Sequence, residues 1–230
     1  MIKDIDMEKV IISKTRYIAC VAVLSAISFV LMLIDFPIPS LIPSFVQMDF
    51  SETPALIGSF ALGPLAGVLI CLFKNLIHLS ITTTSCVGEL CNFLIGILLV
   101  VPAGLIYRYK KTRLGALIAC VVGSVVAGLG SFPINLFISY PFYYNFMPKE
   151  AILSAYQVIL PSVDSIEKCL IAFNTPFTFA KGIFDSIITF VIYKSISPLI
   201  KGYNLKKIKK SVEPTDDSTE NETNKTETEN

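Results

Sequence analysis

Apolar residues along this chain gather into long continuous runs instead of the short alternating patterns of soluble proteins. Four runs are clear, and they cover residues 17–34, 90–107, 114–138 and 171–192. Each reaches the ~18 residues that a transmembrane helix needs. None shows the ~10-residue alternation of a membrane β-barrel strand. The pattern therefore predicts an all-α integral membrane protein.

A fifth apolar run, residues 53–80, has an awkward length and is interrupted at Gly63-Pro64. As one helix it would be about 42 Å long, whereas the hydrocarbon core of a bilayer is about 30 Å thick. Lys74 and His78 lie near its far end, and polar groups at membrane depth usually face the protein interior or a solute pathway. This run can cross the membrane once as a long helix or twice as a short helical hairpin.

Three clusters of basic residues decide between these two topologies. They lie in the N-terminal arm, in residues 108–113 and in residues 194–210. Basic residues favour the cytoplasmic side of a membrane. A single crossing of the fifth run would place the last two clusters outside, whereas a hairpin places all three inside.

The charge distribution thus predicts six transmembrane helices in a bundle, with both termini cytoplasmic and helices 2 and 3 forming a short Gly-Pro hairpin. The predicted spans are residues 17–34, 53–62, 64–80, 89–107, 113–140 and 171–194. They lie in a membrane domain of residues 17–200, after a cytoplasmic arm of residues 1–16 and before a basic, then acidic, disordered tail of residues 201–230.

Composition and motifs narrow the function. Hydrophobic residues make up 53% of the chain and charged residues 16%, and the mean hydropathy is +0.66, as expected of a membrane protein. The formal net charge of +1 gives no indication of nucleic-acid binding. The chain has no phosphate-loop, GxSxG or HExxH motif and only one histidine, so we expect no enzymatic activity, metal or cofactor.

Several polar residues within the spans are candidates for binding a solute. Thr178, Lys181 and Asp185 are spaced to share one helix face in the last span. Lys181 is interpreted either as the ion-pair partner of Asp185 or, as we favour, as a donor that points into a solute pocket. Asn135 can bind a planar heterocyclic edge or make an interhelical hydrogen bond. Glu89, at the start of the fourth span, can bind a solute or simply favour the helix N-terminus.

Small residues in the first span suggest a surface where another helix can approach closely. Ala22 and Ala26 are four residues apart, which is the small-xxx-small spacing of helix packing in membranes. The pair can serve internal packing or a partner protein.

A series of motifs covers about residues 15–200, and their order is specific. They are MDFSETPALIG at 48–58, ALGPLAG at 61–67, KNLIHL at 74–79, VGELCNF at 87–93, Asn135 with Tyr140-Pro141, and PFTFAKG at 176–182. In these motifs the chain resembles the membrane substrate-binding (S) components of energy-coupling factor (ECF) vitamin transporters, and most closely the riboflavin-type members.

The resemblance implies a pocket for a vitamin, captured from outside beneath the first external loop. In that family the loop and the outer ends of the last three helices form the pocket. The ligand-binding residues expected here are Asn135, Thr178, Lys181, Glu89, Gly88, Leu41 and Met48. Thr178 departs from the riboflavin-type pattern, which typically has asparagine at this position.

The resemblance also implies partners. Ala22 and Ala26 match an alanine pair that docks on the coupling membrane subunit, and two ATPase subunits supply the energy. We therefore expect riboflavin or a related small vitamin as the transported ligand, and a location in the bacterial cell membrane.

Three other hypotheses remain open. The same fold could bind flavin mononucleotide or another vitamin. A stand-alone proton-coupled transporter could use Lys74, His78 and Glu89, although a histidine buried against a neighbour is the simpler interpretation of His78. A purely structural assembly subunit would bind no small molecule.

Overall fold

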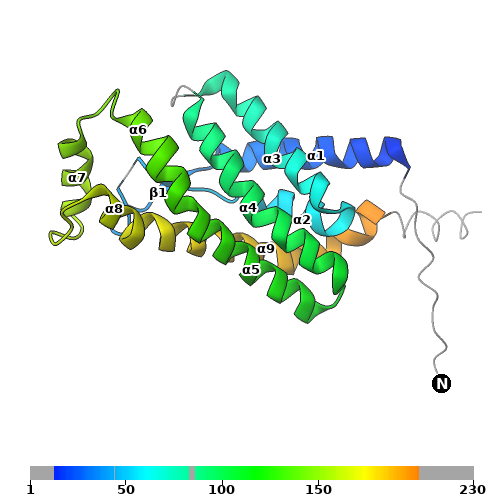
Figure 1. The fold of residues 1–230 in the computed structure, drawn as a ribbon. Coiled ribbons are helices and arrows are strands. Elements are labelled where there is room, and N and C mark those ends of the chain that lie inside the picture. Colours follow the sequence, from blue (N-terminus) through cyan, green and yellow to red (C-terminus); the bar gives the residue numbers. More distant parts are fainter. Residues whose placement is uncertain (1–12, 44, 83–85, 202–230) are drawn as a thin grey trace, which may run out of the picture.

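The computed structural model describes residues 13–43, 45–82 and 86–201, which form a bundle of long helices (Figure 1). The main helices are α1 (Lys14–Met32), α2 (Glu52–Leu62), α3 (Pro64–His78), α4 (Val87–Tyr109), α5 (Arg113–Ile134) and α9 (Thr175–Lys201). Most of the predicted N-terminal arm and nearly all of the predicted disordered tail lie outside the described residues.

Local sequence signals fix where several helices begin. The Ser13 hydroxyl accepts a hydrogen bond from the Arg16 N–H at the start of α1, at 3.3 Å. The Thr112 hydroxyl does the same for the Gly115 N–H in α5, at 3.0 Å. These side chains satisfy N–H groups that have no partner within the helix. Pro64 is the first residue of α3, where its missing N–H costs nothing.

The awkward apolar run is divided at Gly63 into α2 and α3. Gly63 has φ +108°, a backbone conformation that side chains disfavour, and it ends α2 before Pro64 begins α3. Nine of the 11 residues of α2 are buried, because α2 packs against α1, α3, α4 and α9. Its apolar character on all sides thus reflects a central position in the bundle.

Within the described residues, five helical segments are long and apolar enough to span a membrane. They are Lys14–Met32, Pro64–Ile81, Val87–Tyr109, Arg113–Tyr143 and Ile166–Tyr193. The second of these adds the short helix η1 (Leu79–Ile81) to α3. The 11 residues of α2 are fewer than a full span requires.

Short elements gather at one end of the bundle. The connection from α1 to α2 contains an antiparallel pair of two-residue strands, β1 (Phe36–Pro37) and β2 (Gln47–Met48). Near it lie α6 (Tyr140–Tyr143), α7 (Lys149–Gln157) and α8 (Ile166–Cys169), as Figure 1 shows. The start of α1, the α4–α5 turn and the end of α9 lie at the opposite end. Helix α7 lies between the predicted spans 113–140 and 171–194, where the sequence analysis proposed no helix.

The core has two parts. One lies among the long helices and includes Val21, Leu56 and Ile70. The other lies at the end with the short elements, where Ile42 and Tyr156 are buried. This second cluster joins the α1–α2 connection to the segment around α7, and so covers one end of the bundle.

Candidate functional site

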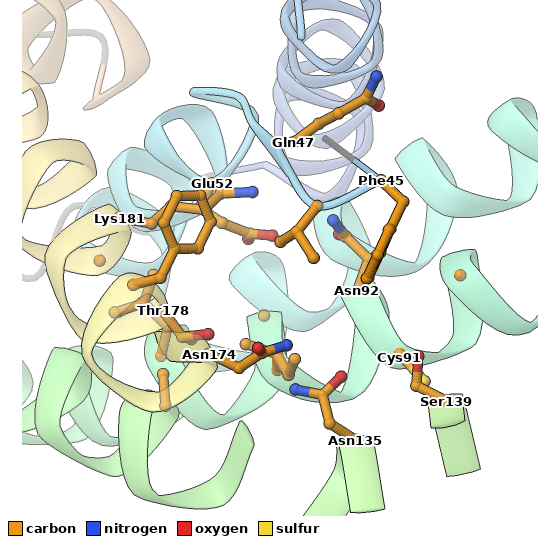
Figure 2. A pocket seen from close by; sticks show the side chains of 18 of the residues that line it. Phe45, Gln47, Glu52, Cys91, Asn92, Asn135, Ser139, Asn174, Thr178 and Lys181 are labelled. Carbon is orange, nitrogen blue, oxygen red and sulfur yellow. The ribbon is translucent and has the colours of Figure 1, made fainter. Parts of the chain in front are cut away.

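A cavity of about 190 Å³ lies between the two parts of the core. Its walls come from the α1–α2 connection, α4, the end of α5 and α9. Figure 2 shows Lys181 and Thr178 on one side, Asn92 on the other, and Asn135 and Asn174 together below them in this view. Polar groups from several elements therefore converge on one space that also has apolar walls, as small-molecule sites usually do.

Four of the predicted ligand-binding residues line this cavity, namely Gly88, Asn135, Thr178 and Lys181. They come from three places far apart in the sequence: the start of α4, the end of α5 and α9. The bundle thus brings together four of the seven residues that the sequence analysis singled out for ligand binding, among them the polar side chains of Asn135, Thr178 and Lys181.

The other three predicted residues do not line the cavity. Glu89 points to His78, with 2.9 Å between Oε1 and Nδ1. Met48 is buried in the second hydrophobic cluster, and Leu41 is 53% exposed. The α1–α2 connection contributes residues 45–47 to the cavity instead, because strand β2 turns Met48 into the core.

Two π-helical turns shape the cavity wall. The first, η2 (Asn135–Ser139), joins α5 to α6, and the second, η3 (Leu170–Asn174), joins α8 to α9. Each widens a long helix by one residue, and such turns are frequent at functional sites. Asn135, Ser139 and Asn174 all line the cavity from these turns. The pattern of apolar residues in the sequence does not predict either turn.

Asn174 is a cavity residue that sequence reasoning missed. Its Oδ1 accepts a hydrogen bond from the Tyr156 hydroxyl at 2.6 Å, and its Nδ2 donates to the Tyr140 hydroxyl at 3.3 Å. The two tyrosine hydroxyls also bond to each other. All three side chains are buried. The available signal was the position of Asn174 four residues before Thr178, on the same side of the helix.

Lys181 pairs with a residue of the α1–α2 connection. Its Nζ donates to Asp49 Oδ2 at 2.6 Å, so the ion pair considered with Asp185 is replaced by one across the bundle. Asp49 Oδ1 accepts from the backbone N–H of Ser51 at 2.8 Å. Burial alone would raise the pKa of Asp49, but Lys181 and Lys74, with hydrogen bonds from Lys181 and Ser51, lower it to about 2. Asp49 is therefore ionised at neutral pH.

A second buried ion pair lies next to the first. Lys74 is fully buried, and its Nζ lies 2.5 Å from Glu52 Oε1 and 2.6 Å from Ser51 Oγ. Glu52 also lines the cavity. Glu52 also lies close to the backbone of α4 at Gly96. A side chain at this position would crowd the carboxylate, because a Cβ there would lie 3.0 Å from Glu52 Oε2. The two ion pairs hold the start of α2 between α3 and α9.

The polar residues of the hypothetical proton relay are engaged in internal contacts. Lys74 pairs with Glu52 and His78 with Glu89. The Asn75 Nδ2 donates to Asn92 Oδ1 of α4 at 3.4 Å. These contacts tie α3 to α2 and α4, which fits the expectation that the histidine packs against a neighbour.

The two faces of α1 differ. Ala22 and Ala26 are exposed, whereas Ser25 and Ser28 are buried. The Ser28 hydroxyl donates to the Ser51 carbonyl beside the ion pairs. The alanine pair therefore lies on the outside of the bundle and takes no part in its internal packing.

Comparison with known proteins gives a consistent picture. A family model described as "ECF transporter, substrate-specific component" matches residues 16–193. The riboflavin transporter RibU of Staphylococcus aureus (strain TCH60) is 30% identical over 193 residues, which cover 84% of this chain and 96% of the relative. The riboflavin transporter FmnP of Bacillus subtilis (strain 168) is 28% identical and covers 82% of this chain and 95% of its own.

A solved structure of the S component of a bacterial ECF transporter is also similar. Its TM-score is 0.65 at 28% sequence identity, and the match covers 82% of this chain and 99% of that chain. The similarity therefore extends over nearly all the helices described above.

Proposed function

The chain belongs to the family of substrate-specific components of ECF transporters, and from this membership we propose that it binds riboflavin for uptake across the cell membrane. It is a transporter component and not an enzyme. The observation that carries the ligand assignment is the convergence of Asn135, Thr178 and Lys181 on one cavity. Relatives that are named riboflavin transporters align over most of the chain and support the same ligand.

The cavity chemistry fits the polar edge of a flavin ring. That edge alternates carbonyl acceptors with an N–H donor. The amide of Asn135 offers both donors and an acceptor, Thr178 offers a hydroxyl, and the Lys181 ammonium has two hydrogens beyond the one given to Asp49. The flat apolar part of the ring would lie against Phe45 and the other apolar walls.

A titration with riboflavin tests this assignment. Purified protein in detergent should be yellow, and mass spectrometry of the released ligand should identify a flavin. Lys181→Ala should weaken riboflavin binding at least tenfold, about 1.4 kcal/mol, in a fluorescence-quenching titration. The matched control is Lys168→Ala, because Lys168 is an exposed lysine that pairs with Asp164 outside the cavity. Equal affinity of Lys181→Ala and the control would refute the pocket assignment.

We further propose a topology of six spans with both termini cytoplasmic, in which α2 and α3 form a short hairpin. The start of α1, the basic α4–α5 turn and the end of α9 share one end of the bundle, which supports placing them together on the cytoplasmic side (Figure 1). The short α2 is tolerable because its backbone is surrounded by other helices.

Cys86 provides a test of this topology. It is exposed at the start of α4, and the other cysteines among the described residues are buried or half-buried. A membrane-impermeant maleimide should label the protein on intact cells, and Cys86→Ser should remove that labelling. Labelling that requires permeabilised cells would place this end of the bundle in the cytoplasm and refute the proposed topology.

The proposed partners are a coupling membrane subunit, which would dock on the exposed Ala22 and Ala26, and two ATPase subunits. The chain alone should then bind riboflavin but transport none.

Uptake into liposomes without any ATPase would favour a proton-coupled transporter instead. Release of flavin mononucleotide or another vitamin from the purified protein would identify the same fold with a different ligand. An assembly subunit would be favoured if the purified protein holds no small molecule and if Asn135→Ala leaves the function of the complete complex unchanged.

A further inference from the structure

Asp185 is a fully buried carboxyl among the residues that line the cavity. It lies on α9 one turn after Lys181, and both residues line the cavity. Its Oδ1 accepts a hydrogen bond from the Thr53 hydroxyl at 2.8 Å. Its Oδ2 is also buried and has no hydrogen-bond partner among the described residues. Buried polar atoms in native proteins nearly always have a partner, so this one calls for an explanation.

The buried charges around Asp185 do not balance if every group is ionised. Lys181 Nζ lies 2.6 Å from Asp49, and Lys74 Nζ lies 2.5 Å from Glu52. Each of these two lysines therefore has its own carboxylate. Among the described residues no basic side chain forms an ion pair with Asp185. An ionised carboxylate without a paired cation is strongly disfavoured in a buried site, and a bound proton removes that cost.

The titratable groups that face Asp185 come from four parts of the fold. They are Lys181 on α9, Asp49 in the α1–α2 connection, Glu52 at the start of α2, and Cys71 on α3. The two carboxylates repel a further negative charge. Lys181 would attract a negative charge on Asp185, but its closest contact is the Asp49 carboxylate. The arrangement as a whole therefore favours the neutral acid at Asp185.

We propose that Asp185 is a further ligand-binding residue that carries a proton, and that its Oδ2 hydroxyl donates a hydrogen bond to a carbonyl of the bound flavin. This inference rests on the proposed riboflavin-binding function. The missing partner of Oδ2 is then the ligand itself. Lys181 and Asp185 present two donors one turn apart, which selects molecules with neighbouring carbonyl acceptors on one edge. An ionised Asp185 could only accept a hydrogen bond and would repel the same carbonyl.

Two substitutions distinguish a neutral donor from a negative charge. Asp185→Ala removes the donor and should weaken riboflavin binding more than about tenfold. Asp185→Asn keeps a neutral donor of the same shape and should restore the affinity to within about threefold of the wild type. Asp164→Asn is the matched control, because Asp164 is an exposed carboxylate outside the cavity. Loss of binding in Asp185→Asn as large as in Asp185→Ala, with both variants folded, would overturn the proposal.

Infrared difference spectroscopy keeps the test decisive if Asp185→Ala fails to fold. The wild type should show a carboxylic-acid C=O band that is absent from Asp185→Asn and that shifts when riboflavin is added. Absence of the band would mean that Asp185 is ionised, and a band that riboflavin leaves unchanged would mean that Asp185 is only structural; either result refutes the proposal. A wild type that binds no flavin at all would instead refute the proposed function.

Discussion

Replacement of Asp49 by asparagine should destabilise the ligand-free protein, because it leaves the largely buried Lys181 ammonium without its counter-charge. The two side chains are 8% and 15% exposed, so water screens them little. Burial opposes ionisation of Asp49, yet Lys181, Lys74 and the hydrogen bonds from Lys181 and Ser51 lower its pKa from 3.8 to about 2. That difference corresponds to about 2 kcal/mol in favour of the ionised, folded form.

The expected loss of unfolding free energy in Asp49→Asn therefore has a lower and an upper bound. The pKa of Asp49 gives about 2 kcal/mol, and removal of one partner from a buried ion pair typically costs about 3–5 kcal/mol. Because the pKa is lower in the folded protein, this stabilisation is present above about pH 4 and is lost as the pH falls through about 2. For a chain of this size, 2 kcal/mol corresponds to a fall of at least about 4 °C in melting temperature.

A double-mutant cycle measures the pair itself. The variants are Asp49→Asn, Lys181→Met and the two combined, and thermal unfolding in detergent can be followed with a thiol-reactive dye. Four cysteines are buried in the folded protein and become reactive on unfolding, namely Cys71, Cys91, Cys120 and Cys169. The double variant should be more stable than the sum of the single effects predicts, because it removes both charges together.

The exposed pair of Asp164 and Lys168 supplies the control for this cycle. Its side chains are 67% and 61% exposed, so water screens the pair and its removal should leave the melting temperature close to that of the wild type. The claim that the pair holds the α1–α2 connection to α9 would be refuted by either of two results. The stability losses of Asp49→Asn and Lys181→Met could add strictly in the double variant, or each single variant could be as stable as this control.

Three further predictions address other parts of the molecule. Gly63→Ala should lower the unfolding free energy by about 1 kcal/mol or more in the same assay, because φ +108° strains any side chain; unchanged stability would show that this conformation is not required. Ala22→Trp with Ala26→Trp should keep riboflavin binding but prevent co-purification with the coupling subunit, whereas Leu129→Trp, at an exposed position on α5, should have no effect; equal behaviour of the two would exclude the alanine pair as the docking surface. Asn174→Ala should weaken riboflavin about tenfold in a fluorescence titration, and full affinity would show that its amide serves only the two tyrosines.

The sequence alone was enough for the features that depend on neighbouring residues. Apolar runs reveal membrane helices because a helix must expose a continuous apolar surface to lipid along its whole length. The interruption of one run at Gly63-Pro64 is also local, since glycine allows the positive φ and proline begins the next helix. Asn135, Thr178 and Lys181 could be selected because polar groups within such runs are costly and therefore usually have a function.

Only the tertiary structure decided which of these polar groups meet. Lys181 and Asp49 are 132 residues apart in the chain, and their contact depends on how α9 packs beside the start of α2. Local spacing suggested Asp185 as the partner, because a residue one turn away is always within reach on a helix. The roles of Asn174 and Glu52 were equally hidden, since the π-helical turn and the Lys74 ion pair that position them form only in the packed bundle. Hydrophobic length is a property of a segment, whereas the pairing of buried charges is a property of the whole fold.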